Sequence, residues 1–373
     1  MQPDADMNQG QPQVSIVVPT YGEANNLRPL TELIAEELAK AGLSWELIIA
    51  NDESGDATDE VCADLDRQYP IRLLNRTANR GLSYAVIDGA ELAGGQVIVV
   101  MDADMSHPPS AIAEMVRLLE AGEADMVMGS RNVAGGKTDE SWSLFRHLNT
   151  FVATTLARPL VVVRDPMSGF FALRRADWPA RDRLDPIGYK IALDIMVRAR
   201  FSRTRVREIP IYFADRKIGE SKLTMREQLK YLRHLYRLYR FRWPRPVEFM
   251  MFALVGLSGV IVDVGVYLPL VGLGLHHEIA RAISYWPATL SNGLLNRAFT
   301  FGDRPRGAIG VQLFQYSIVA SLGFLVNWGC YALLTRNVDF FAEYKVLALI
   351  AGILAGMMFT FSGAHKLVFR KRL

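Results

Sequence analysis

The sequence predicts an α/β domain with a mostly parallel sheet, followed by an all-α domain of four transmembrane helices. Two observations lead to this fold class. From Val14 to about Arg245, short apolar runs alternate with amphipathic stretches, which is typical of strands and helices around a parallel sheet. Beyond Arg245, long stretches carry almost no charge. The two parts together explain how 22% charged residues coexist with a positive mean hydropathy of +0.11.

The composition of the 373 residues excludes several classes of protein. A net charge of +3 is too small to indicate a nucleic-acid binder. Two cysteines far apart, Cys62 and Cys330, predict neither a disulfide framework nor a zinc site. Residues 1–13 are polar and lack the basic and apolar regions of a secretory signal, so we expect a disordered leader.

The α/β domain is expected to span residues 14–224. Its short apolar runs, which we expect to be strands, are 14–18, 47–50, 71–74 and 97–101. Helices are expected at 27–41 and 109–121, where apolar residues recur at helical spacing. A chain of roughly 200 residues or more can bury a full core.

Residues 225–246 are expected to form basic amphipathic helices at the membrane surface. Apolar and aromatic residues recur at helical spacing, with Lys230, Arg233, Arg237 and Arg240 between them. A solvated face of an ordinary helix can look the same, but the position just before an apolar span favours an anionic leaflet.

The membrane domain is expected to span residues 247–373. Its four nearly uncharged stretches are Phe249–Leu275, Ala282–Phe301, Val311–Thr335 and Val346–His365. Each reaches the ~20 residues that a helix needs to cross the hydrocarbon core. Asp263 and Arg297 are the charges inside the first two stretches, and they are candidates either for a functional pair or for structural and interfacial roles.

Positive charge predicts the orientation of these spans. Basic residues precede the first span, separate the second from the third, and follow the fourth: Arg240, Arg242, Arg245, Arg304, Arg306, Lys366, Arg370, Lys371 and Arg372. Arg336 and Lys345, after the third span, fit less well. The positive-inside rule puts both termini and the α/β domain in the cytoplasm.

Acidic side chains follow a buried strand. The run 96–101 leads into Asp102 and Asp104, and open α/β sheets bind ligands beyond the carboxyl ends of their strands. Two carboxylates at i and i+2 can converge on one Mg²⁺ or Mn²⁺, which also binds diphosphate oxygens. Aspartate is equally common in turns and helix caps, and Ser106 also fits a cap.

Two earlier strand ends, at 19–23 and 51–54, are also acidic or aromatic. Together with the Asp102 region they would form a pocket for a base, a ribose and a diphosphate. The chain has no GxGxxG, GxxxxGK[ST], HExxH or GxSxG motif, which argues against dinucleotide-binding, P-loop, zinc-protease and nucleophile-elbow sites.

Eight segments, in order from about Val14 to Leu223, resemble the family-2 glycosyltransferases, and more narrowly the dolichyl- or polyprenyl-phosphate mannose synthases. They are VSIVVPTYGEANNL, NDESGDAT, ANRGLSYAVIDGA, MDADMSHPP, MGSR, DPMSGFFALRR, GYKIALDIMV and GESKL. The motifs DPMSGFF, GYKI and GESKL distinguish this subgroup. The membrane part resembles the four-span GtrA-like domain in FALVG (252–256), NRAFTF (296–301) and KLVF (366–369).

This resemblance implies a GT-A-like nucleotide-sugar fold and roles for particular residues. The nucleoside positions match Pro19, Tyr21, Glu23 and Asp52, with Asp102 also near the nucleotide. The metal and diphosphate motif matches Asp102 and Asp104, with Ser106 as a further metal position. The donor diphosphate and acceptor phosphate match Arg131 and Arg216, and the acceptor loop matches Ser221 and Lys222. In a structural interpretation, Glu23 caps a helix and Arg131 forms a surface ion pair.

Three positions depart from the family pattern. Gly22 stands where Asn is usual, and Asn51 replaces the first Asp of a pair beside the base. Ser106 replaces a frequent Gln and is shorter, so it would reach a metal through water. These departures leave the preferred base and the preferred metal open.

The resemblance implies a dolichyl/polyprenyl-phosphate mannosyltransferase that is a multi-pass protein of the cell (inner) membrane. Its acceptor, a polyprenyl phosphate, is already anionic, so an inverting single displacement needs no general base. GDP-mannose is the expected donor, and UDP-glucose is the alternative because Asn51 alters the base pocket. A sugar-lipid translocation role for the membrane domain is a second alternative, and a homo-oligomer is compatible with the sequence.

Overall fold

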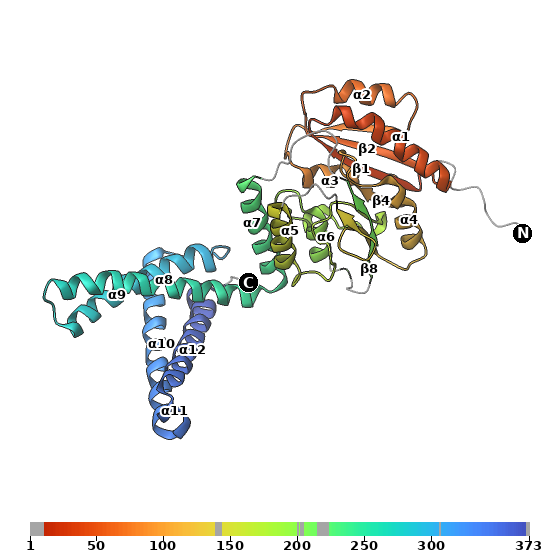
Figure 1. The fold of residues 1–373 in the computed structure, drawn as a ribbon. Coiled ribbons are helices and arrows are strands. Elements are labelled where there is room, and N and C mark those ends of the chain that lie inside the picture. The colour runs from red at the N-terminus through yellow and green to blue at the C-terminus, as the bar shows by residue number, and fades with distance from the viewer. Residues whose placement is uncertain are drawn as a thin grey trace, which may run out of the picture. The chain divides into compact units, whose positions relative to one another are not determined.

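A computed structural model describes residues 11–138, 144–199, 201, 205–214, 224–305 and 307–370. The chain divides into two compact units, Met1–Arg242 and Trp243–Leu373 (Figure 1).

Unit 1 is built on a seven-stranded sheet with the order β3-β2-β1-β4-β7-β5-β8. The strands are β1 Val14–Thr20, β2 Trp45–Asn51, β3 Ile71–Asn75, β4 Val97–Val100, β5 Met126–Ser130, β7 Phe171–Arg174 and β8 Val206–Pro210. All neighbours are parallel except β7, which runs antiparallel to β4 and β5. The mostly parallel sheet expected from the sequence is confirmed.

Helices cover both faces of this sheet. Successive strand residues point to opposite faces, and every residue of β1 is buried, so both faces must be covered. On one face, Ile16 and Ile49 belong to the core cluster that includes Leu27, Ile34 and Met115. On the other face, the helix α3, Leu82–Glu91, packs against β1 at Gly89. A Cβ added to Gly89 would lie 2.6 Å from Val17 Cγ1, so only glycine lets the helix approach the strand so closely. The helices of this part are α1 Ala24–Ala41, α2 Thr58–Leu65, α3 Leu82–Glu91 and α4 Ile112–Glu120.

The reversal of β7 decides which loops meet. Its first residue, Phe171, pairs with Val100, the last residue of β4. The loop that enters β7 therefore lies at the same sheet edge as the loop that leaves β4. A short second sheet pairs β6 Lys137–Thr138 with β9 Tyr212–Phe213.

The last helices of unit 1 are α5 Leu144–Ala157, α6 Ile191–Arg198 and α7 Met225–Arg242. The predicted amphipathic helix α7 packs one face on its own unit. Tyr231 donates from its hydroxyl to the Ala153 carbonyl of α5 at 2.7 Å, and Arg237 pairs with Asp185 at 2.7 Å. On α6, Asp194 is fully buried 3.8 Å from His234 of α7.

Unit 2 consists of the helices α8 Pro244–Gly272, α9 His277–Leu295, α10 Ile309–Asn337, α11 Asp339–Glu343 and α12 Lys345–Gly363. Two π-helical turns, Asn296–Thr300 and Ala364–Val368, extend α9 and α12. Within the described residues, three helical segments are long and apolar enough to span a membrane: Pro244–Gly272, Ile309–Asn337 and Lys345–Val368.

The expectation of four spans was therefore one too many by these criteria. The second stretch was expected at Ala282–Phe301, but its helix begins five residues earlier, at His277. It thereby takes in Glu278 and Arg281, which lower its hydropathy.

The interior of unit 2 relies on small residues and on a few polar bonds. A Cβ on Gly356 of α12 would lie 2.7 Å from the Gly323 carbonyl oxygen of α10, so these helices touch through their backbones. Arg304 is buried and donates to Glu248 at 2.6 Å and to the Phe369 carbonyl at 2.7 Å. This pair joins the start of α8 to the segments after α9 and α12.

Asp263 and Arg297 do not form the functional pair that was one of the two interpretations of these charges. Asp263 pairs with Arg281 of α9 and accepts a 2.7 Å hydrogen bond from Ser284. Arg297 instead donates to the Gly307 carbonyl at 3.0 Å and to the Gln312 side chain. Each charge thus has a separate polar partner set.

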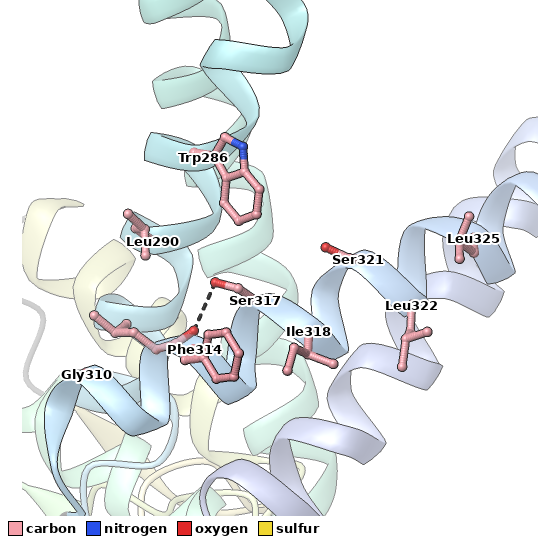
Figure 2. A pocket seen from close by; sticks show the side chains of 10 residues that line it. Trp286, Leu290, Gly310, Phe314, Ser317, Ile318, Ser321, Leu322 and Leu325 are labelled. Atoms are coloured by element: carbon pink, nitrogen blue, oxygen red, sulfur yellow. Dashed lines mark hydrogen bonds between the residues drawn. The ribbon is translucent and has the colours of Figure 1, made fainter.

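A largely apolar pocket of about 520 Å³ lies between α9 and α10 (Figure 2). Trp286 and Leu290 contribute from α9, and the α10 side is formed by residues between Gly310 and Leu325. Its two serine hydroxyls are satisfied within the unit, since Ser317 donates to the Leu313 carbonyl and Ser321 bonds the Tyr285 hydroxyl.

Candidate active site

The two predicted metal-binding carboxylates follow β4 directly. Asp104 is buried, and one of its oxygens accepts hydrogen bonds from the Ser106 hydroxyl at 2.6 Å and the Ser106 N–H at 3.1 Å. Asp102 keeps 30% of its side chain exposed. Between them and the following helix, Met105 adopts φ +58°, which turns the chain sharply. Ser106 therefore orients Asp104, a role that the sequence did not predict.

His107 is a site residue that the sequence analysis missed, although it lies within the MDADMSHPP motif. It is buried, its Nδ1 accepts the N–H of Asp102 at 3.0 Å, and its ring stacks on Phe170 at 5.1 Å between centroids. Burial lowers the pKa of His107 below its usual value. A neutral ring is also what an accepting Nδ1 requires, so His107 fixes the backbone of Asp102 without adding charge.

Arg131, expected at the substrate phosphates, follows β5 and binds Asp165. Two parallel hydrogen bonds of 2.7 Å join its guanidinium to the Asp165 carboxylate, and the backbone N–H of Arg131 donates a third at 3.1 Å. Asp165 is fully buried, and these bonds outweigh burial and hold its pKa below the usual range. The Arg131 guanidinium also lies 5.0 Å from the Phe213 ring. An ion pair therefore exists, but it is largely buried and not the surface pair of the structural interpretation, and it fixes the direction of the arginine.

Asp165 belongs to a loop, residues 165–170, that contacts several parts of the site. A Cβ on Gly169 would lie 3.7 Å from both carboxylate oxygens of Asp102, so this backbone forms a wall beside the carboxylate. The start of the loop is bound by Glu208 of β8, whose carboxylate accepts hydrogen bonds from the backbone N–H groups of Arg164 and Asp165 at 2.8 and 3.0 Å. The sequence marked the DPMSGFF motif as distinctive without assigning it a role.

Three predicted nucleoside residues lie at the end of β1 and just beyond it. Pro19 is buried in the strand, whereas 56% of Tyr21 is exposed. Glu23 occupies the N-cap position of α1 and accepts a 2.7 Å bond from the Asn26 side chain. Glu23 thus stands at the helix start, but its carboxylate accepts no backbone N–H of the described helix as a capping side chain would. Its nucleoside role stays a prediction.

Asp52, the fourth predicted nucleoside residue, is buried at the end of β2. Its carboxylate accepts a hydrogen bond from buried Arg76 and another from the Gly81 N–H at 2.6 Å. Asn51, where the family has a carboxylate, donates to Asn75 at 3.0 Å. Asp52 thus anchors the loop that enters α3, which the spacing alone did not indicate.

Lys190 is a second residue that the sequence analysis missed, in the GYKI motif. It is half-buried at the N-cap position of α6, and its Nζ donates to the Met167 carbonyl of the 165–170 loop at 2.6 Å. Burial lowers its pKa to about 8, with Arg131 contributing in the same direction.

The remaining predicted residues, Arg216, Ser221 and Lys222, lie outside the described residues. Asp102 and Asp104, by contrast, are brought to the sheet edge where Arg131 also lies. Their placement supports a hard divalent cation, since one carboxylate is partly exposed and the other is oriented by Ser106. In the described part of the chain, no group of three or more His, Cys, Asp or Glu is arranged to hold a metal, so ligand oxygens would complete such a site.

Two family models match the chain, one in each unit. Residues 15–178 match "Glycosyl transferase family 2". Residues 251–370 match "GtrA/DPMS, transmembrane domain". With its apolar helices, unit 2 identifies the chain as a membrane protein.

Curated relatives extend over both units. A dolichol-phosphate mannosyltransferase from Pyrococcus furiosus is 37% identical over 346 residues, which cover 91% of this chain and 95% of the relative. One from Mycosarcoma maydis is 38% identical over 254 residues, or 66% of this chain and 86% of the relative. Among solved structures, the chain is similar to glucosyl-3-phosphoglycerate synthase from Mycobacterium tuberculosis, with 19% identity and a TM-score of 0.46. The superposition covers 62% of this chain and 80% of the synthase chain.

The weak structural likeness transfers neither a donor nor a metal to this chain, whereas the curated relatives match along most of its length. The mostly parallel sheet with its DxD at the end of β4, the two family models and the 37% identity agree with one another. The chain belongs to the family-2 glycosyltransferases with a GT-A-like domain, and within them to the group that carries a GtrA/DPMS transmembrane domain.

Proposed function

We propose that this protein transfers mannose from GDP-mannose to a polyprenyl phosphate and releases GDP. The observation that carries the proposal is the 37% identity to a dolichol-phosphate mannosyltransferase along 91% of the chain. The position of Asp102, Asp104 and Arg131 at one sheet edge is compatible with the proposal.

The proposed reaction is an inverting single displacement. An oxygen of the acceptor phosphate attacks the anomeric carbon of mannose, and the bond from that carbon to the β-phosphate oxygen breaks. The attacking phosphate is already ionised, so no residue has to remove a proton. Asp102 and Asp104 would hold Mg²⁺ or Mn²⁺, which neutralises charge on the leaving diphosphate.

In this proposal, the protein itself supplies position and electrostatics. Asp165 fixes the guanidinium of Arg131 through two parallel hydrogen bonds, so that little reorganisation is needed when phosphate binds. Arg216, Ser221 and Lys222 are proposed to contact the acceptor phosphate as the family pattern implies. Ser106 is proposed to act on the metal through Asp104.

The proposed acceptor is membrane-bound, and unit 1 presents a surface suited to a membrane. Leu148 and Phe151 of α5 and Leu229 of α7 are each at least 60% exposed, and a hydrogen bond from Tyr231 to Ala153 joins the two helices. Exposed apolar side chains next to Arg226 and Arg233 suit an anionic leaflet. We propose that this face rests on the cytoplasmic leaflet and that unit 2 anchors the chain.

A donor panel tests the proposal. Purified full-length protein receives a polyprenyl phosphate, Mg²⁺ or Mn²⁺, and radiolabelled GDP-mannose or UDP-glucose, and the lipid product is extracted. We expect label in the lipid fraction with GDP-mannose only. Label with UDP-glucose only would make the protein a glucosyltransferase, and no lipid-linked label with either donor would refute the proposed acceptor chemistry.

A further inference from the structure

The amine of Lys190 has an unusual environment for a lysine. It donates to one backbone carbonyl, Met167 O, at 2.6 Å. In the part of the chain that the structure describes, no carboxylate lies within 4.0 Å of it. Its Nζ also lies 4.4 Å from the centroid of the Tyr189 ring, a cation–π contact. Of the three N–H donors of the ammonium, one has a hydrogen-bond acceptor among the described residues.

The position of Lys190 ties it to the active site. In the 165–170 loop, the Asp165 carboxylate accepts hydrogen bonds from Arg131, and the Met167 carbonyl accepts one from Lys190. The backbone of the same loop at Gly169 lies beside the carboxylate of Asp102. These three contacts fall within five consecutive residues. The nearest influences on the charge of Lys190 are accordingly Arg131, Asp165 and Asp102.

Without a ligand, a cation at this point is poorly placed. Lys190 is the N-cap residue of α6, where the helix dipole is positive and disfavours a cation. Arg131 adds a second positive charge, and burial removes hydration, which together bring the pKa of Lys190 to about 8. A residue that breaks the local electrostatic rule in this way is expected where a bound anion compensates.

We propose that Lys190 is a phosphate-binding residue of this active site, donating from Nζ to a phosphoryl oxygen of the sugar donor or of the acceptor. This inference rests on the proposed function, because it takes both substrates to be phosphates. It gives the GYKI motif a chemical role, since Lys190 supplies a second cationic donor, after Arg131, from a different element of the fold.

A purely structural role is the alternative, in which the amine only holds the Met167 carbonyl. Lys190→Gln separates the two roles, since the amide keeps an N–H donor and loses the charge. Lys190→Arg keeps the charge. Lys40→Met is the control, because Lys40 is exposed on α1 and pairs with Glu36 and Glu37 on the same helix.

The test measures kcat, the KM of each substrate, the Kd of GDP with Mg²⁺, and the melting temperature of each full-length variant. We expect kcat/KM to fall about 100-fold in Lys190→Gln and less than about tenfold in Lys190→Arg, with melting temperatures unchanged. A weaker GDP affinity assigns the contact to the donor, and a raised acceptor KM alone assigns it to the acceptor. Lys190→Gln within threefold of wild type would overturn the inference.

A second measurement needs no variant. Acetylation of Lys190 in the wild-type protein is followed by mass spectrometry with and without pyrophosphate or a short-chain prenyl phosphate, each with Mg²⁺. Slower acetylation of Lys190, with Lys40 unaffected, supports the inference, and protection by neither probe overturns it. The outcome is independent of turnover, so a failure of the proposed sugar transfer would be visible separately in the donor panel.

Discussion

Many more of the large apolar side chains face outward in unit 2 of this protein than in unit 1. In unit 1, Ile16, Ile34 and Phe170 are fully buried between the sheet and its helices. In unit 2, Ile261 is 73% exposed and Trp328 is 61% exposed, and the interior combines glycines and polar pairs with a small apolar cluster around Phe301. Unit 1 is therefore stabilised by removing apolar surface from water. Unit 2 gains little from this effect in a membrane, so close packing and paired polar groups must stabilise it.

The largest expected effect tests whether the chemistry needs Asp102 of unit 1. Asp102→Asn keeps the shape of the side chain and the backbone bond to His107, but removes the charge that would hold a divalent cation. We expect turnover to fall more than about 1000-fold, measured as lipid-linked product, while the melting temperature stays near that of wild type. Asp66→Asn, on the exposed end of α2, is the matched control. Near-normal turnover would reject the role of Asp102 at a metal.

The next effect tests whether polar pairing stabilises unit 2. Arg304→Ala would leave Glu248 buried without its guanidinium partner, at a cost of about 3–5 kcal/mol in the free energy of unfolding. The measurement is unfolding of the detergent-solubilised protein by a denaturing detergent. The double variant Arg304→Met with Glu248→Gln removes both charges and is expected to recover most of the loss. An equal loss in both variants would show that charge pairing is not the cause.

A pair of identical substitutions sharpens the contrast directly. Ile34→Ala removes a fully buried side chain from unit 1 and should cost about 2–5 kcal/mol. Ile261→Ala removes an outward-facing side chain from unit 2 and should cost less than about 0.5 kcal/mol. Denaturant unfolding followed by circular dichroism measures both in the same full-length chain. Similar costs at the two positions would contradict the comparison.

The smallest effect concerns the pH stability of unit 1. Burial lowers the pKa of His234 to about 4, and its Nδ1 accepts the Ile187 N–H at 3.1 Å, which requires a neutral ring. The native state thus binds fewer protons than the unfolded state, whose histidine has a pKa near 6.5. Stability contributed by His234 is therefore present above pH 6.5 and is lost as the pH falls towards 4, by up to about 3 kcal/mol.

The comparison with His234→Gln isolates this contribution. Asp194, which faces His234, has a pKa raised by burial and acts in the opposite direction, and Asp185, Arg198 and Arg237 also face the ring. These groups remain in the variant, so the difference between the two stability curves reports the histidine alone. We expect that difference to shrink steadily from pH 7 to pH 4, and a constant difference would be evidence against a neutral buried ring.

Much of the fold was predictable because its patterns are local. The apolar runs 14–18, 47–50, 71–74 and 97–101 are all within or next to strands of the sheet. The reversed strand β7 was not predictable, since its direction depends on pairing with β4 and β5 far along the chain. The start of α9 at His277 was also missed, because the absence of charge indicates a span and not the first residue of a helix.

The site was predictable where one motif contains both the residue and its chemistry. Asp102 and Asp104 became candidates because they follow a strand and lie among other motifs of the family, and their role at a metal stays a prediction. Arg131 was recognised, but its fixed direction depends on Asp165, which lies in a different motif. Lys190 was missed for the same reason, since its environment comes from a loop that only the fold brings near.

The reversed strand also couples the closing of a strand edge to the placement of one loop of the site. During synthesis, Asp102 and Asp104 emerge from the ribosome about 60 residues before the loop that will face them. Until β7 is made, β4 has no neighbour on one side, and an open strand edge of this kind invites pairing with other chains. When β7 pairs with β4, it closes that edge and brings the 165–170 loop to the site at the same time. Closing this strand edge and placing the 165–170 loop are thus coupled, because both depend on the pairing of β7 with β4.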